Sequence, residues 1–305
     1  MIKKIIWMLQ PPRSGGTLFC RLLDGHSKIL VYPTVFRFPN RIWPKIYKVK
    51  NLKGFFNLFR FMILKKFDKV GIKKQSSNVK QIRYPFSFNF KYFQNILKKN
   101  FRKVNKFNYL NFFFNTFFLS WKNINQNFLS VKYYFGHSTL ENPKKFMINI
   151  NNFFCNTNCY LVVYIIRDPI DWYLSSRYLK NSIKQFKDKK NIDRFFYYYS
   201  SMLSQAIQSK KNYNIIFINF EDLIISPKKI LTKFCSRIKI KFEKKLLIPS
   251  FNGNKFISNS SFNLSSKKID KRVLKRKRKL SKKELFYLKK YNCEKLFNEA
   301  KNFCL

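Results

Sequence analysis

The start of the chain joins a short apolar run directly to a glycine turn and a helical pattern. Ile2 to Leu9 is rich in strand-forming side chains, and Gln10 and two prolines end the run, as expected of a buried strand. Beyond the glycines, apolar residues at positions 18, 19, 22 and 23 mark one face of a helix. The sequence therefore predicts a strand, a turn and a helix in direct succession.

The turn between this strand and this helix reads PPRSGGT. Such a turn points backbone N–H groups and the positive end of the helix dipole at whatever lies above it, and anions bind there. Gly15 and Gly16 allow the backbone a close approach to anion oxygens. Ser14 and Thr17 add hydroxyl donors, and Arg13 adds a forked cation. From the loop alone, an ordinary glycine turn remains the alternative.

Later strands follow the same pattern. Cys159 to Ile166 is almost continuously apolar, as parallel strands covered on both faces are. Ile215 to Asn219 is a further strand, and the helix after it has Pro227 at a plausible first position, with Ser226 as its N-cap. A serine and a glutamate at positions 281 and 284 form a capping box for the last helix. Alternating strands and helices predict a three-layer α/β fold, a mostly parallel central sheet with flanking helices.

The middle of the chain, from about residue 35 to residue 131, lacks this rhythm and is aromatic and basic. One helical face within it is strongly apolar. That face consists of Leu110, Phe113, Phe114, Phe117, Phe118 and Trp121. We therefore expect one domain, residues 1–305, with a helical aromatic-rich insertion or acceptor cap at about 35–131.

Basic residues greatly outnumber acidic ones, 63 against 14, for a formal charge of +49. An excess of this size suggests a nucleic acid or another anionic partner. Lys, Asn, Phe, Ile and Tyr are abundant together, however, and the basic residues are spread along the whole chain, which indicates AT-rich codon bias. We expect no specific nucleic-acid partner, although a positive field would speed the capture of an anionic cofactor.

The six cysteines show no C-x-x-C spacing, and the chain has only two histidines, so we expect no zinc site. The N-terminus lacks a signal-peptide pattern. The longest apolar stretch, Phe107 to Trp121, is interrupted by asparagines and is too short to span a bilayer. We therefore expect a soluble, cytoplasmic protein with no transmembrane segment.

The loop resembles a known family motif. PPRSGGTLFCRLLDGH is similar to the 5′-phosphosulfate loop of the sulfotransferases that use 3′-phosphoadenylyl sulfate (PAPS). The resemblance implies a P-loop NTPase-like sheet, although the Walker pattern of true nucleoside triphosphatases is absent. Gly16 stands where many members have Thr. The residues that would bind the 5′-phosphosulfate are Arg13, Ser14, Gly15, Gly16, Thr17 and Leu18.

A second motif, YIIRDPIDWYLSS, resembles the 3′-phosphate motif of the same family. The resemblance assigns Arg167 and Ser175 to the 3′-phosphate. An arginine at a strand end can bind a phosphate with two parallel hydrogen bonds, and a serine on the following helix adds a neutral donor. Taken alone, R-D-P is more often a salt-bridged strand end. Two such motifs in the family's order make the resemblance specific.

Two weaker matches follow. NFEDLIISPKK resembles a family helix in which Glu221 and Asp222 would be structural caps. Phe251 to Phe262 resembles a cofactor loop, with Ser258 where the family has Gly. The cofactor-binding residues of that loop would be Asn259, Ser260 and Ser261. The basic segment after it resembles another 3′-phosphate contact, which leaves three candidates open: Arg272, Arg276 and Arg278.

Sulfuryl transfer is an in-line displacement, so fixed cations and N–H donors at the leaving group should carry most of the catalysis. The resemblance gives this role to Arg13 and implies no metal. Some members have a glutamate base where this chain has Thr34. His137 is the candidate base, because histidine titrates near neutrality, and Glu141 is the alternative. His26 ends the loop helix, where a structural role is typical.

The sequence thus predicts a sulfotransferase that moves a sulfuryl group from PAPS to a hydroxyl or amine, with a carbohydrate or surface polymer as acceptor by analogy. Two alternatives remain at this point. One is a basic α/β protein that binds nucleic acid or another polyanion. The other is a P-loop kinase of a small metabolite, with Asp168 as its magnesium ligand, although the Walker lysine is missing.

Overall fold

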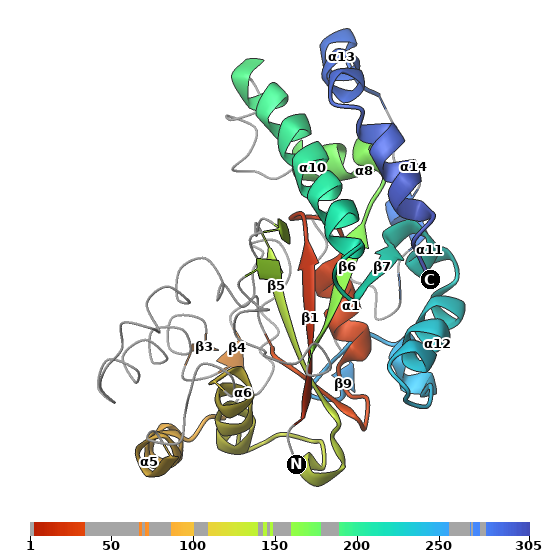
Figure 1. Cartoon of the computed structure of the whole chain (residues 1–305). Coiled ribbons are helices and arrows are strands. Elements are labelled where there is room, and N and C mark those ends of the chain that lie inside the picture. The colour runs from red at the N-terminus through yellow and green to blue at the C-terminus, as the bar shows by residue number, and fades with distance from the viewer. Residues whose placement is uncertain are drawn as a thin grey trace.

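The computed structural model describes residues 3–33, 67–68, 71–72, 87–100, 109–139, 143–144, 147–148, 160–177, 189–255, 269, 271–274 and 279–305. Its centre is a five-stranded sheet in the order β2-β5-β1-β6-β7, visible in Figure 1 with β1 between β5 and β6. All four pairings are parallel. The strands are β1 (Lys4–Gln10), β2 (Ile29–Val31), β5 (Tyr133–Thr139), β6 (Tyr160–Ile166) and β7 (Ile215–Asn219).

Helices cover both faces of the sheet, which confirms the three-layer α/β prediction. Ile5, Trp7 and Leu9 of β1 pack on one face with α6, α8, α10 and α14. Ile6 and Met8 alternate with them and pack on the other face with α1, α11 and α12. The helices are α1 (Gly16–Leu23), α5 (Phe90–Asn100), α6 (Tyr109–Ser120), α8 (Pro169–Arg177), α10 (Lys189–Lys210), α11 (Phe220–Ile225), α12 (Pro227–Arg237), α13 (Lys282–Lys290) and α14 (Cys293–Lys301).

Short elements complete the described chain. Two antiparallel pairs lie outside the main sheet, each of two-residue strands. They are β3 (Phe67–Asp68) with β4 (Gly71–Ile72) and β8 (Ser250–Phe251) with β9 (Asn254–Lys255). The 3₁₀ turns are η2 (Phe128–Ser130), η4 (Lys244–Leu247) and η5 (Lys271–Leu274).

The helix starts follow local sequence. The predicted capping box at α13 is confirmed, because Ser281 and Glu284 bond each other's backbone N–H groups. Pro227 opens α12 as predicted, and Ser226 is its N-cap position, but the serine side chain makes no capping hydrogen bond there. The predicted apolar face of α6 is buried in the core on one side of the sheet, from Phe113 at 0% exposed to Leu110 at 2%, and Trp121, one residue past the helix, is 3% exposed.

Two strands of the sheet were not predicted. β2 has only three residues. β5 reads YYFGHST, with a glycine and three polar residues in its second half, and it lies between β1 and β2. His137, expected in a segment that precedes a strand, is itself a strand residue opposite Met8 of β1.

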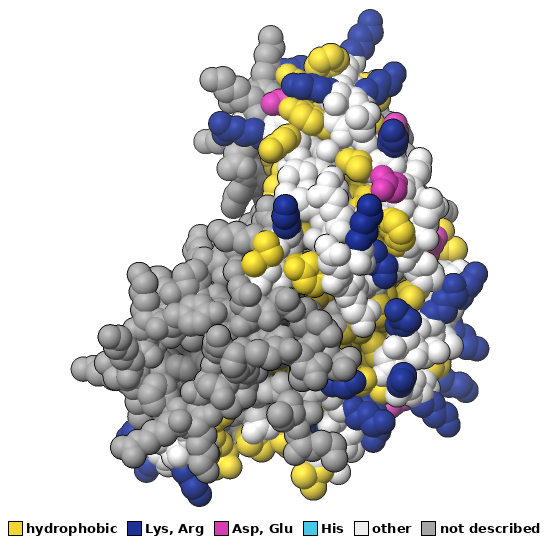
Figure 2. Space-filling view, in the orientation of Figure 1, with side chains coloured by type: hydrophobic (Ala, Val, Ile, Leu, Met, Phe, Trp, Pro, Cys, Tyr) yellow, Lys and Arg dark blue, Asp and Glu magenta, His cyan; other side chains and the backbone are white. Residues whose placement is uncertain are grey.

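Lys and Arg side chains are spread over the face seen in Figure 2, from α13 at the top to α12 at the lower right, with few acidic side chains between them. Of the helices in the described part of the chain, none is both long and apolar enough to cross a bilayer. Four cysteines in that part are free thiols: Cys20, Cys235, Cys293 and Cys304.

Candidate functional site

The turn after β1 has an irregular backbone that ends at a helix N-terminus. Arg13 and Gly15 both have positive φ, 71° and 96°, and the Ser14 N–H donates to the carbonyl of Pro11 at 3.3 Å. Gly15 is the N-cap of α1, and no side chain caps the helix there. The first N–H groups of α1 are therefore left for a ligand, as at other anion-binding helix starts.

Gly15 must be glycine for two reasons. Its φ of 96° is left-handed. In addition, a Cβ at this position would stand 2.0 Å from Cδ2 of Phe220, the first residue of α11. The aromatic ring therefore packs directly against the loop backbone.

Arg167, at the end of β6, joins the second sequence motif to this loop. Its Nη1 donates to the carbonyl of Arg13 at 2.7 Å, across 154 residues of sequence. The guanidinium lies over the Phe220 ring, 4.5 Å from its centroid, and the residue is only 4% exposed. Its Nε and Nη2 have no hydrogen-bond partner among the described residues. Two buried donors are thus available to an anion.

The charge around Arg167 is only partly balanced. Glu221 Oε1 lies 4.0 Å from Nε, at the limit of an ion pair, so R-D-P is also a loosely salt-bridged strand end. Burial lowers the pKa of the Arg167 guanidinium, and Glu221 and Asp171 oppose that shift. Burial raises the pKa of Glu221 to about 7, although Arg167 acts against it.

Helix α8 also holds the loop. Trp172 Nε1 donates to the carbonyl of Pro12 at 2.6 Å. Since Arg167 holds the next carbonyl, two successive carbonyls of the loop, those of Pro12 and Arg13, are held from α8 and the end of β6. Ser175, eight residues after Arg167, is buried on the same helix at 2% exposed.

Two acidic residues near Arg167 serve the backbone. Asp168 Oδ1 accepts from the N–H groups of Ile170 and Asp171 at 3.0 and 3.1 Å and so caps α8. Glu221, expected to cap its own helix, instead accepts from the Asp168 N–H at 3.3 Å. The cap of α11 is Asn219, whose side chain accepts from the Asp222 N–H.

Ser14 and Thr17 differ in exposure. Ser14 is fully buried, and its Oγ has no hydrogen-bond partner among the described residues. Thr17 is exposed in the first turn of α1, and Leu18 beside it is half-buried. The loop thus presents one buried and one open hydroxyl.

His137 contacts α1. It is 4% exposed, and its Nδ1 lies 3.2 Å from the Cys20 Sγ, in the second turn of the helix. Burial raises the pKa of the Cys20 thiol, which keeps it protonated at neutral pH. His137 therefore lies on the α1 face of the sheet. Its Nδ1 contacts the Cys20 sulfur, and Nε2 is the second ring nitrogen.

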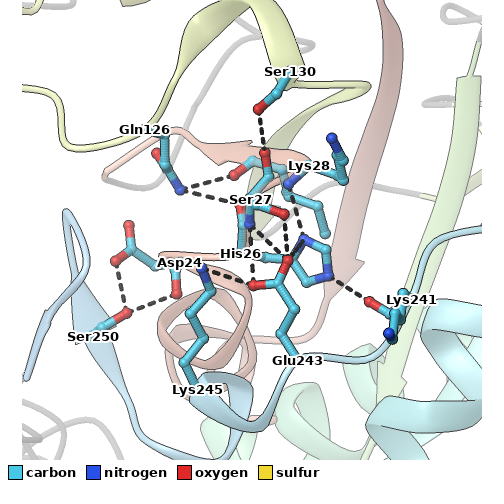
Figure 3. Close-up of polar contacts among 11 residues, drawn as sticks. Asp24, His26, Ser27, Lys28, Gln126, Ser130, Lys241, Glu243, Lys245 and Ser250 are labelled. Carbon is cyan, nitrogen blue, oxygen red and sulfur yellow. Dashed lines mark hydrogen bonds and ion pairs between the residues drawn. The ribbon is translucent and has the colours of Figure 1, made fainter.

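His26 belongs to a separate network at the far end of α1 (Figure 3). Its Nδ1 accepts from the Lys28 N–H at 3.0 Å, and its Nε2 therefore donates to the Lys241 carbonyl, also at 3.0 Å. The Glu243 carboxylate bonds Ser27 in the same network. Burial lowers the pKa of His26. These contacts join the end of α1 to the segment after α12, which agrees with the expected structural role.

Several sequence candidates lie outside the described residues. They are Thr34, Glu141, Ser258, Asn259, Ser260, Ser261, Arg276 and Arg278. For Arg272 only the backbone is described, as part of η5. In the described part of the chain, no group of three His, Cys, Asp or Glu side chains could hold a metal ion.

Sequence reasoning missed three residues of this site. Trp172 and Phe220 carry no charge, and the motifs that contain them assign them no role. A signal existed for Trp172, because a buried indole N–H needs an acceptor. Gln10 was read only as the end of a strand, yet it is 4% exposed. The alternation along β1 places it on the same face as Met8 and α1.

Comparison with known proteins gives a fold. No family model and no curated protein sequence matches the chain. Among solved structures, the sulfotransferase domain of the curacin biosynthetic pathway aligns with a TM-score of 0.55 at 16% identity, over 95% of this chain and 98% of that one. The sulfotransferase domain of the Synechococcus PCC 7002 olefin synthase aligns with a TM-score of 0.52 at 14% identity, over 94% of each chain.

Proposed function

Because the chain has the fold of the sulfotransferases, we propose that it transfers a sulfuryl group from PAPS to a hydroxyl or amine. One contact carries the proposal: Arg167 of the second motif donates to the loop carbonyl of Arg13 at 2.7 Å. The two motifs, far apart in sequence, are therefore in direct contact, which supports a single binding site for both ends of the donor. A doubly phosphorylated nucleotide has the spaced anionic groups that such a site fits.

The residues present fit this donor. The uncapped start of α1 and the buried Ser14 hydroxyl offer neutral donors for the 5′-phosphosulfate. Arg13, Gly15, Gly16, Thr17 and Leu18 would complete that cradle. At the other end, Arg167 with its two available donors, assisted by Ser175, would hold the 3′-phosphate. We assign Asn259, Ser260 and Ser261 to the donor as well, on resemblance alone.

The chemistry would need little more than positioned charge. PAPS supplies a sulfuryl group on a phosphate leaving group. Negative charge grows on the bridging oxygen during transfer, and Arg13 together with the N-terminus of α1 would stabilise it. Because these donors are fixed by the fold, they need no reorganisation during the reaction.

We propose His137 as the base that accepts the acceptor's proton. Its Nδ1 is next to the neutral Cys20 thiol. When Nδ1–H donates to the sulfur, Nε2 is the basic nitrogen and can take a proton. Glu141 remains the alternative base.

The acceptor we propose is a carbohydrate or surface polymer, by analogy with the family. The net charge of +49 supports an anionic glycan, which a positive field would attract. We place the reaction in the cytoplasm. The four described cysteines are all free thiols, as in proteins of a reducing compartment.

Thermal unfolding in the presence of nucleotides tests the donor. Adenosine 3′,5′-bisphosphate, the product form of the donor, should stabilise the protein by about 2.7 kcal/mol at a concentration 100 times its Kd. ATP with Mg²⁺ should stabilise it much less. Arg167→Ala should remove most of the shift, whereas Arg177→Ala, which breaks an ion pair between the end of α8 and Glu284 of α13, should keep it.

No shift with the bisphosphate would contradict the proposal. A larger shift with ATP and Mg²⁺ would favour a kinase instead. Steeply salt-dependent binding of DNA or RNA, unaffected by the bisphosphate, would favour the polyanion-binding alternative.

A further inference from the structure

Gln10 is the last residue of β1 and is almost completely buried, at 4% exposed. Its strand neighbours on both faces are apolar, from Ile5 to Leu9. Its place in the alternation puts its side chain on the α1 face, with Met8. A carboxamide at this position costs free energy unless its polar atoms find partners.

The Gln10 side chain fills the space above Gly16, the first residue of α1. A Cβ on Gly16 would stand 2.0 Å from Gln10 Oε1 and 2.1 Å from Nε2. Gly16 is therefore glycine for lack of room, whereas Gly15 also needs a positive φ. Any larger side chain at position 16 would have to displace the carboxamide.

The carboxamide is also incompletely satisfied. Gln10 Oε1 is buried and has no hydrogen-bond partner among the described residues. It lies against the start of α1, where no side chain caps the helix. A rotation about the last side-chain bond exchanges Oε1 and Nε2, so this position can present an N–H donor to an anion. A buried polar group with an unsatisfied oxygen thus lies against the first residue of α1, where no side chain caps the helix.

We propose that Gln10 is a ligand of the 5′-phosphate of the nucleotide, which it binds through Nε2 above Gly16. The inference rests on the proposed function for the identity of the nucleotide. In this proposal the hydrogen-bond donor to the 5′-phosphate is a side chain of β1. Gly16 leaves the space that this side chain occupies. Gln10 and Gly16 act as a pair.

Two nucleotides separate this role from others. Gln10→Leu and Gln10→Met keep the side-chain volume and remove the donor. Each should weaken binding of adenosine 3′,5′-bisphosphate about tenfold or more, as loss of a hydrogen bond to a charged group does. Binding of adenosine 3′-monophosphate, which lacks the 5′-phosphate, should be unchanged. Isothermal titration calorimetry measures both affinities, and circular dichroism confirms that each variant is folded.

The pair itself can be tested by substitution at Gly16. Gly16→Ala should displace the carboxamide. It should therefore weaken bisphosphate binding by about the same factor as Gln10→Leu. In a Gln10→Ala background the second change should cost little more, because the clash is gone. Gln10→Ala with Gly16→Thr should recover part of the affinity by supplying a hydroxyl donor.

The outcomes distinguish the two proposals. Wild-type protein that does not bind the bisphosphate overturns the proposed function, and the role of Gln10 with it. If the wild type binds the bisphosphate but folded Gln10→Leu and Gln10→Met bind it equally well, only the role of Gln10 is overturned. Equal losses for the bisphosphate and the 3′-monophosphate also overturn it, since they would indicate a general disturbance of the site.

Discussion

Arg167 combines two tasks that are usually given to separate residues. One nitrogen of its guanidinium holds the loop carbonyl of Arg13, and two others are available to a ligand. Lysine at this position has its donors on a single nitrogen, so it could not hold the carbonyl and also present a two-nitrogen fork to a phosphate. Ser14 and Gln10, which we propose as nucleotide ligands, are also buried polar side chains with an atom that has no partner among the described residues.

His137→Ala should reduce turnover by about 10²-fold or more, the usual contribution of a general base, and should leave bisphosphate affinity nearly unchanged. Turnover is followed as release of the bisphosphate from PAPS in the presence of a glucosamine oligosaccharide, which carries hydroxyls and an amine. His26→Ala is the matched control, because His26 lies in the network at the other end of α1. Full activity of His137→Ala would remove it as the base.

Glu221 should make the protein less stable at higher pH. Burial raises its folded pKa from 4.5 to about 7. Its contribution to stability is therefore fully present below about pH 4.5 and is lost as the pH rises through about 7. Glu221→Gln, which cannot ionise, should be more stable than wild type at pH 8 by on the order of 1–3 kcal/mol.

Urea unfolding at pH 5 and pH 8 measures this difference. The gain of Glu221→Gln should shrink at pH 5, where the wild-type carboxyl is mostly protonated in the folded state. Glu284→Gln is the control, since its folded pKa is shifted in the other direction. Equal gains for Glu221→Gln at both pH values would contradict a raised folded pKa.

At the scale of elements, the strands that the sequence predicts correctly are those whose own residues form a clear strand pattern. β1, β6 and β7 are short apolar runs with clear stops. β5 was missed because Gly136 and His137 weaken its strand pattern, and neighbouring strands on both sides hold it in place. The loop and Arg167 were assigned from motifs, whereas the contacts of Gln10 and Cys20 depend on how α1 packs on the sheet.

Gly136 illustrates why β5 is hard to recognise. A Cβ at this position would stand 3.1 Å from ring atoms of both Phe114 in α6 and Trp7 in β1. The glycine weakens strand propensity but lets α6 approach the sheet closely. Gly136→Ala should therefore lower the free energy of unfolding by about 1–3 kcal/mol, as overpacking of a core does.

Chemical denaturation measures that loss. Phe114→Leu removes one of the two rings, so the combined variant should lose less than the sum of the two single losses. Strict additivity would mean that Phe114 does not limit the space at position 136.

At the scale of the whole molecule, 63 basic residues cannot be neutralised by 14 acidic ones. Ion pairs occur in the described chain, as between Lys290 and Asp193, yet on the face seen in Figure 2 the Lys and Arg side chains far outnumber the acidic ones. Any polyanion should relieve part of this repulsion. For this reason the stabilisation by the bisphosphate must be compared with the stabilisation by ATP, which is also strongly anionic.

The hydrogen bonds from Arg167 and Trp172 to the loop carbonyls affect how the two ends of a nucleotide would be recognised. Under the proposed function, a 3′-phosphate that orders the Arg167 guanidinium also steadies the backbone that receives the 5′-phosphate, since the same side chain holds the Arg13 carbonyl. The entropy cost of ordering the guanidinium and the loop backbone is then incurred once for both phosphates, so the two phosphates bind cooperatively. The site would discriminate by phosphate position, favouring nucleotides that carry both a 3′- and a 5′-phosphate over monophosphates and 5′-diphosphates, which are phosphorylated at one end alone.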